Sequence, residues 1–203
     1  MKNIHTQESG RSMIEMLGVL AIIGVLSVGG IAGYSQAMNK FKVSKTTDQI
    51  QTLVTNIRTL TASQRDYALV GQPALLQKMG ALTDEMCSSA TCSASNMVNP
   101  YGGTIKVGTY TDKKHFYVSY QGLPASACIS LASQSWGDAS SGLVAVATSA
   151  AAVATISAPG TTSSNGTMVT ADNGGSNGMP MSLDSASAGC GSASTSTVTF
   201  YYR

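Results

Sequence analysis

Glu15 is the residue of this 203-residue chain whose setting is least expected, because it is a single acid inside a long apolar stretch. It is the only carboxylate or ammonium side chain between Arg11 and Lys40, and residues 13–32 are otherwise apolar or small. A carboxylate in hydrocarbon costs on the order of 3 kcal/mol even on insertion-based scales, so it needs a partner. Opposite charges attract far more strongly at low dielectric constant than in water, so Glu15 should favour the approach of a positive group from a neighbouring molecule.

The second group of residues that could take part in chemistry is the four cysteines. All of them follow the apolar stretch: Cys87, Cys92, Cys128 and Cys190. An even number in an exported chain indicates two disulfides, for which three pairings exist. We favour Cys87 with Cys92 and Cys128 with Cys190. A zinc site would need four convergent ligands, but the cysteine spacings do not suit a CxxC pair, and only His5 and His115 could add to them. We therefore expect no metal site and no cofactor.

Composition argues against several classes of function. The net charge is only +2, charged residues make up 11% of the chain and aromatic residues 6%, while Gly, Ser, Thr and Ala are abundant. Nucleic-acid binding needs clustered Lys and Arg, and the longest cluster is Lys40, Lys42 and Lys45, which we interpret as a solvated or headgroup-level helix face. The composition suits an extended β-rich extracellular module better than a cytosolic enzyme.

The apolar stretch predicts a membrane helix, since about 20 such residues at ~1.5 Å each span the ~30 Å core of a bilayer. Ser12 could cap this helix, with Glu15 at capping-box spacing. Beyond Tyr34 the apolar residues recur at helical spacing, and no proline precedes Pro73, so one helix is expected from about residue 12 to about residue 65. Gly29 and Gly33 form a small-xxx-small step that would let neighbouring helices approach closely.

The remaining sequence predicts mainly strands and turns. We expect a short helix around residues 75–82, a turn at 99–103, a hairpin of 104–109 with 115–120, a helix over 125–133 after Pro124, and strands at 143–147, 168–170 and 197–202. His115 is interpreted as a strand-end surface residue. The run DNGGSNG at 172–178 could hold calcium by composition, but its spacing does not match an EF-hand loop, so a turn is favoured.

Residues 9–15, SGRSMIE, followed by the apolar helix, resemble the start of type IV prepilins. Three further blocks resemble type IVb pilins, especially the bundle-forming pilins of enteric bacteria: NPYGGTIKVG at 99–108, FYVSYQGLPASACISLASQSWG at 116–137, and STVTFYY at 196–202. The resemblance implies an α+β type IV pilin fold, in which a long N-terminal helix packs on an antiparallel sheet.

The same resemblance implies how the chain is divided and processed. Prepilin peptidase would remove residues 1–10 by cutting between Gly10 and Arg11. Residues 11–38 would form the membrane and filament-core helix, 39–66 its amphipathic continuation, and 67–203 the globular head. A bridge from Cys128 to Cys190 would frame the variable region used for subunit contacts and display. The leader would stay inside the cell, although the basic residues flanking the helix favour the opposite orientation.

The function implied is that of a structural subunit, a major pilin. As a precursor, such a chain would reside in the bacterial inner membrane. The pilus assembly machinery would then assemble it into a helical homo-oligomer on the cell surface, which would serve adhesion, aggregation or DNA transfer. Glu15 would compensate the N-terminal amine of a neighbouring subunit. The alternatives are a minor pilin or secretion pseudopilin, and an uncleaved membrane-anchored binding module. No enzymatic role is expected, since His115 would be the only neutral-pH base of the mature chain and no Walker, HExxH or GxSxG motif occurs.

Overall fold

A computed structural model of the chain describes residues 9–137, 139–156, 167–170, 178–192 and 195–203, with side chains from Met13 onward. The chain divides into two compact units, Met1–Phe41 and Lys42–Arg203. The first unit consists of the apolar part of helix α1, and the second is the head. Each unit is described by itself below.

Helix α1 runs from Ser9 to Thr61 and is the long uninterrupted helix expected from the absence of proline. It begins before Ser12, so the expected cap at Ser12 with Glu15 as its capping-box partner is wrong for the uncut chain, in which Ser12 already lies within the helix. The helix also ends four residues before Arg65. Beyond it the chain turns back, with the Gln64 N–H donating to the Thr61 carbonyl at 2.8 Å.

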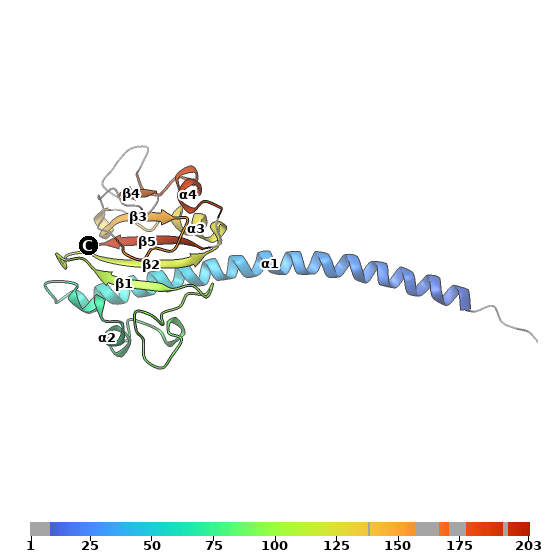
Figure 1. The fold of residues 1–203 in the computed structure, drawn as a ribbon, viewed down its shortest axis with the longest axis horizontal. Helices are drawn as coiled ribbons and strands as arrows, with labels where there is room; N and C mark the ends of the chain where they lie inside the picture. Colours follow the sequence, from blue (N-terminus) through green and yellow to red (C-terminus); the bar gives the residue numbers. More distant parts are fainter. Residues whose placement is uncertain (1–8, 138, 157–166, 171–177, 193–194) are drawn as a thin grey trace, which may run out of the picture. The chain divides into compact units, whose positions relative to one another are not determined.

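Five antiparallel strands form one sheet in the order β1-β2-β5-β3-β4 (Figure 1). Their bounds are β1 Ile105–Thr109, β2 Phe116–Leu123, β3 Leu143–Ser149, β4 Met168–Thr170 and β5 Ser196–Tyr202. The C-terminal strand β5 is central, and Val118 of β2 lies opposite its Phe200. The sheet and the long helix confirm the α+β pilin-like architecture expected from the resemblance.

Alternating side chains along the strands point to opposite faces of the sheet, and both faces are covered. Phe116, Val118 and Tyr120 of β2 belong to the larger core cluster, together with fully buried side chains of the head part of α1: Ile50, Leu53 and Ile57. On the other face, Tyr201 packs with Ala145 and Ala147 of β3. The head is therefore held by a helix face with 3.6-residue spacing lying on strands with two-residue spacing.

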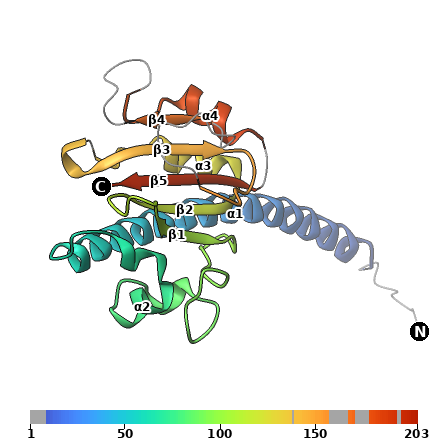
Figure 2. The same ribbon diagram turned by 60° about the vertical axis from the view of Figure 1, so that its left-hand side comes forward.

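Short helices complete the head: η1 Ala68–Gly71, α2 Pro73–Lys78, η2 Asp84–Met86, α3 Ala125–Ala132, η3 Ala139–Ser141 and α4 Leu183–Cys190. Helices α3 and α4 pack against each other and against β5 and β3 (Figure 2). Pro124 precedes α3 as expected. Helix α4 was not expected from the sequence. Its N-cap is Ser182, whose hydroxyl accepts a hydrogen bond from the Ser185 N–H at 3.2 Å.

Candidate assembly segment and disulfide-framed head

The predicted cleavage site lies at the start of α1, where the backbone of Gly10 and Arg11 is already helical. The leader residues before Ser9 lie outside the described part of the chain. Cleavage between Gly10 and Arg11 therefore stays a prediction, and so does the division of the chain at residues 10, 38 and 66.

The apolar unit carries a continuous exposed apolar surface. From Met13 to Ala37 every residue is exposed, and the large apolar side chains between Met13 and Ile31 are 53% to 75% exposed. This is the one helix among the described residues that is long and apolar enough to cross a membrane by length and composition. A surface of this kind marks a helix that is covered by lipid or by other protein chains.

Glu15 is the one charged side chain on this surface among residues 13–37, and it is exposed. The ion pairs formed within the described residues are Lys45 with Glu85, at 2.6 Å, and His115 with Asp112, at 2.9 Å, so Glu15 has no charged partner there. Gly29 and Gly33 are equally unused within the chain, because a Cβ at either position would meet nothing within 4 Å. Glu15 and the two glycines thus have no described role within one subunit, and their roles between subunits remain predictions.

In the head, the structure joins Cys87 to Cys92 and Cys128 to Cys190, which is the pairing favoured from the sequence. The second disulfide links α3 to the end of α4, and both of its cysteines are fully buried. It encloses a chain segment with a sequence separation of 62, which contains β3, β4 and the residues 157–166 and 171–177 outside the described part. Most of the run DNGGSNG lies in that second gap, so the calcium alternative is untested.

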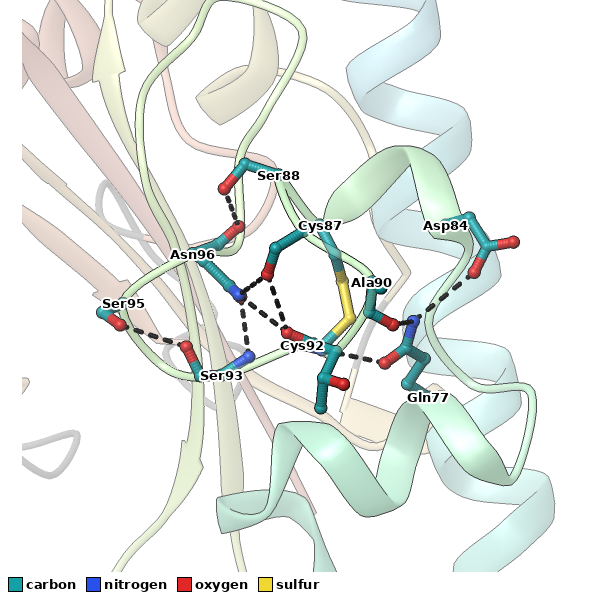
Figure 3. Close-up of a disulfide and its surroundings, with 11 residues drawn as sticks. Gln77, Asp84, Cys87, Ser88, Ala90, Cys92, Ser93, Ser95 and Asn96 are labelled. Carbon is teal, nitrogen blue, oxygen red and sulfur yellow. Dashed lines mark hydrogen bonds between the residues drawn. A yellow bond between two sulfur atoms is a disulfide. The ribbon is translucent and has the colours of Figure 1, made fainter.

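Two side chains hold the small loop closed by Cys87 and Cys92 (Figure 3). Gln77 of α2 accepts the Cys92 N–H at 2.8 Å and donates to the Ala90 carbonyl at 3.3 Å. On the other side, Asn96 accepts the Ser93 N–H through its Oδ1 at 2.7 Å. Sequence reasoning gave Gln77 and Asn96 no role. Asn96 follows Cys92 closely, but Gln77 belongs to α2, and only the folded head brings it to the loop.

Tyrosines on the sheet have altered ionisation. Burial raises the pKa of Tyr201 to about 12, and it raises the pKa of Tyr110 further still. Burial also raises the pKa of Tyr202 to about 12, although the nearby Arg58 opposes the shift. Tyr110 and Tyr201 stack with ring centroids 6.2 Å apart. These phenols therefore stay neutral through the physiological range and act as packing groups.

His115 immediately precedes β2, at the strand-end position expected for it, and its Nδ1 lies 2.9 Å from Oδ2 of Asp112. The hydrogen bond from His115 lowers the pKa of Asp112. In the part of the chain that the structure describes, no group of three or more His, Cys, Asp or Glu side chains comes together to hold a metal ion. Through its hydrogen bond to Asp112, His115 contributes to the turn between β1 and β2.

A protein-family model described as Bundlin matches residues 35–167, which is well over half of the chain. The chain belongs to the Bundlin family. This membership confirms the resemblance to bundle-forming type IVb pilins. The matched residues include the head part of α1, the loop closed by Cys87 and Cys92, Cys128 of the second disulfide, and strands β1 to β3. Cys190 and the central strand β5 follow the matched range.

Two curated relatives agree with the family match. The major structural subunits of bundle-forming pilus from Escherichia coli O127:H6 and from Escherichia coli O111:H- are each 26% identical to this Bundlin-family chain over 137 residues. Each alignment covers 66% of this chain and 69% of the relative. These relatives are structural pilus subunits, and the Bundlin-family chain described here is not an enzyme.

A solved structure shares the fold. The crystal structure of TcpA, a type IV pilin from Vibrio cholerae El Tor biotype, matches with a TM-score of 0.53 and 14% sequence identity. The match covers 80% of this chain and 99% of TcpA. At that identity the comparison establishes a common architecture. The Bundlin-family head therefore has the type IV pilin fold.

Proposed function

We propose that this chain is the major structural subunit of a type IVb pilus, which it forms by stacking the apolar parts of α1 from many copies into a filament core. The observation that carries the proposal is the exposed apolar surface of residues 13–37 with its one acid, Glu15, attached to a head of the pilin fold. Membership in the Bundlin family and the described relatives support the same role.

Physical chemistry explains why such a helix would assemble. An exposed apolar helix is unstable in water, so before assembly it would reside in the bacterial inner membrane. In lipid, Gly29 and Gly33 would let helices approach closely, and an unpaired Glu15 would attract a positive group at the N-terminus of another copy. Cleavage after Gly10 by prepilin peptidase would create that group, the free amine of Arg11.

Sheared surface material from the producing cells tests this proposal. Filaments should consist mainly of this chain, and mass spectrometry should find subunits that begin at Arg11, with both disulfides formed. Filaments in which this chain is a trace component would indicate a minor pilin or pseudopilin. A chain that begins at Met1 and stays in the membrane fraction would indicate an anchored binding module, and either result would contradict the proposal.

A further inference from the structure

A pocket of about 300 Å³, called the Asp48 pocket below, opens on the surface of the head between α1 and η2. Asp48 and Thr52 of α1 line one side of it, and Glu85 and Met86 of η2 line the other. Its walls are mainly apolar, but Asp48 and Glu85 are exposed, so a group that enters the pocket can reach them. All of these residues belong to the unit Lys42–Arg203.

The lining of the Asp48 pocket is negatively charged. Its charged residues are one lysine and two acids, Lys45, Asp48 and Glu85, which gives a net charge of −1. Lys45 is already bound to Glu85, with Nζ 2.6 Å from Oε2, and neither ion pair among the described residues includes Asp48. The residues of the head outside the described part contain no Lys, Arg or His that could pair with it. The pocket therefore favours one additional positive charge.

Apolar walls below an acidic rim suit a long aliphatic side chain that ends in an ammonium group. The methylene stem of such a side chain packs on apolar surface, while its ammonium stays at the rim and binds a carboxylate there. A volume of about 300 Å³ lies at the small end of ligand sites, which run from about 300 to 1,000 Å³, so the pocket holds one side chain. A lysine of another molecule therefore fits both the shape and the charge of the pocket.

Two adjacent lysines, Lys113 and Lys114, lie exposed in the turn that joins β1 to β2. Asp112 holds this turn by accepting the Lys114 N–H at 3.0 Å and by pairing with His115. The Lys113 carbonyl accepts the Tyr67 N–H at 2.8 Å, which attaches the turn to the chain beyond α1 (Figure 1). The two lysines are thus carried on a preorganised support, which lowers the entropic cost of binding.

The Asp48 pocket and the lysine turn lie far apart on the head. The pocket borders α1 at Asp48, and the turn is attached beyond the end of α1 at Thr61, so about 20 Å of helix separates the two levels. A lysine of the turn cannot reach the pocket of its own chain across that distance. Two complementary patches at different places on a subunit form a head-to-tail contact, and such contacts repeat from copy to copy along a helical filament.

We propose that the Asp48 pocket receives a lysine of the β1–β2 turn, Lys113 or Lys114, from a second copy of this chain. One entering ammonium balances the net charge of the lining. The inference rests on the proposed function, because a filament is the assembly in which copies repeat head to tail. It adds a charged contact between heads to the packing of the apolar parts of α1. Such contacts determine orientation and register more than affinity.

Carbodiimide coupling of sheared filaments tests the contact in the unmodified chain. The reagent joins a carboxylate to an adjacent amine as an amide, taking up the water that is lost and leaving as a urea. Mass spectrometry of the digested filaments should find peptides that join Lys113 or Lys114 to Asp48 or Glu85, and the chain in detergent micelles should lack them. The link between Lys45 and Glu85 should appear in both samples, since that pair lies within one subunit.

Charge-reversed variants test whether the two groups attract each other. Asp48→Lys should lower the filament yield at least tenfold with both disulfides formed, and so should Lys113→Glu with Lys114→Glu. Combining all three changes in one chain should restore the yield to within threefold of the unmodified chain, because the attraction returns with its signs exchanged. Arg65→Glu with Lys78→Glu is the matched control. It reverses two exposed cations outside the pocket and the turn, and it should keep most of the yield.

Four results would overturn the proposal. Filaments with the link between Lys45 and Glu85 but none from the turn to the pocket would do so, as would a combined variant that assembles no better than the separate ones. A link from the pocket to a peptide of another protein would show a different occupant. If the unmodified chain forms no filaments, the pilus role fails as well, and this result distinguishes failure of the proposed function from failure of the contact alone.

Discussion

Glu15 combines two properties that are rarely found together. It is exposed on an apolar helix surface, and it has no charged partner among the described residues. A cap at the helix start would have been a sufficient explanation for its position. In the uncut chain α1 begins at Ser9, ahead of Ser12, so Ser12 does not cap the helix there. We therefore predict that this carboxylate interacts with a group outside the subunit.

Buried tyrosines make the head sensitive to alkali. The pKa of both Tyr201 and Tyr202 rises from 10.0 to about 12, so between these values the unfolded chain loses phenolic protons that the folded chain keeps. The free energy of unfolding should therefore be unaffected below about pH 10 and should fall by about 1.4 kcal/mol per pH unit per tyrosine up to about pH 12. Urea unfolding of the detergent-solubilised chain, repeated at several values between pH 8 and pH 12, measures this decline in the free energy of unfolding.

Tyr201→Phe is the control for that prediction, because it removes one titrating phenol and keeps the ring. Its stability should decline less steeply with pH than that of the unmodified chain. Identical slopes for the two proteins would show that Tyr201 does not contribute to the loss.

Gly103 sits where a side chain cannot be accommodated, since a Cβ there would overlap the backbone carbonyl of Gln121. The Asn99 side chain also donates to that carbonyl, at 2.7 Å. Gly103→Ala should therefore lower the free energy of unfolding by about 1–3 kcal/mol. Gly71→Ala, where a Cβ meets nothing within 4 Å, should be close to neutral in the same urea experiment. Equal effects of the two substitutions would contradict the close approach.

Among the elements, those with strong local patterns were predictable and those defined by small residues were not. The hairpin of β1 and β2, the last strand and the long helix follow from alternation, from helical spacing and from the absence of proline. Helix α4 has the sequence LDSASAGC, which lacks an apolar stripe, so tertiary contacts with α3 and β3 define it. Its one local signal was Ser182 as an N-cap.

The disulfide between α3 and α4 should stabilise the head more than the one within the loop after η2. On the chain-entropy account, closing a loop with a separation of 62 is worth roughly 4 kcal/mol, and a separation of 5 is worth roughly half as much. Replacing Cys128 and Cys190 together by Ala should therefore lower the urea midpoint further than replacing Cys87 and Cys92. The reverse order would show that local hydrogen bonds around the small loop, such as those of Gln77 and Asn96, outweigh loop length.

For the molecule as a whole, the sequence allowed the broad architecture to be predicted but not which distant segments meet in the head, such as those lining a cavity of about 290 Å³ beside Arg58. The apolar helix, the cysteines and the pilin-like blocks are continuous in the chain, so each can be recognised locally. The cavity lining joins residues 51–58 to residues near 136 and to Tyr202, and only the folded head brings these segments together. Arg58 in the sequence is one more polar residue of an amphipathic helix.

Filament yield from Glu15 variants tests the central claim, that this acid drives assembly, most directly. We expect Glu15→Ala to insert into the membrane with both disulfides formed, and its sheared surface filaments to fall at least tenfold. Glu15→Asp, which keeps the charge, should retain part of the yield. A Glu15→Ala strain that sheds filaments at the level of the unmodified chain would contradict the account.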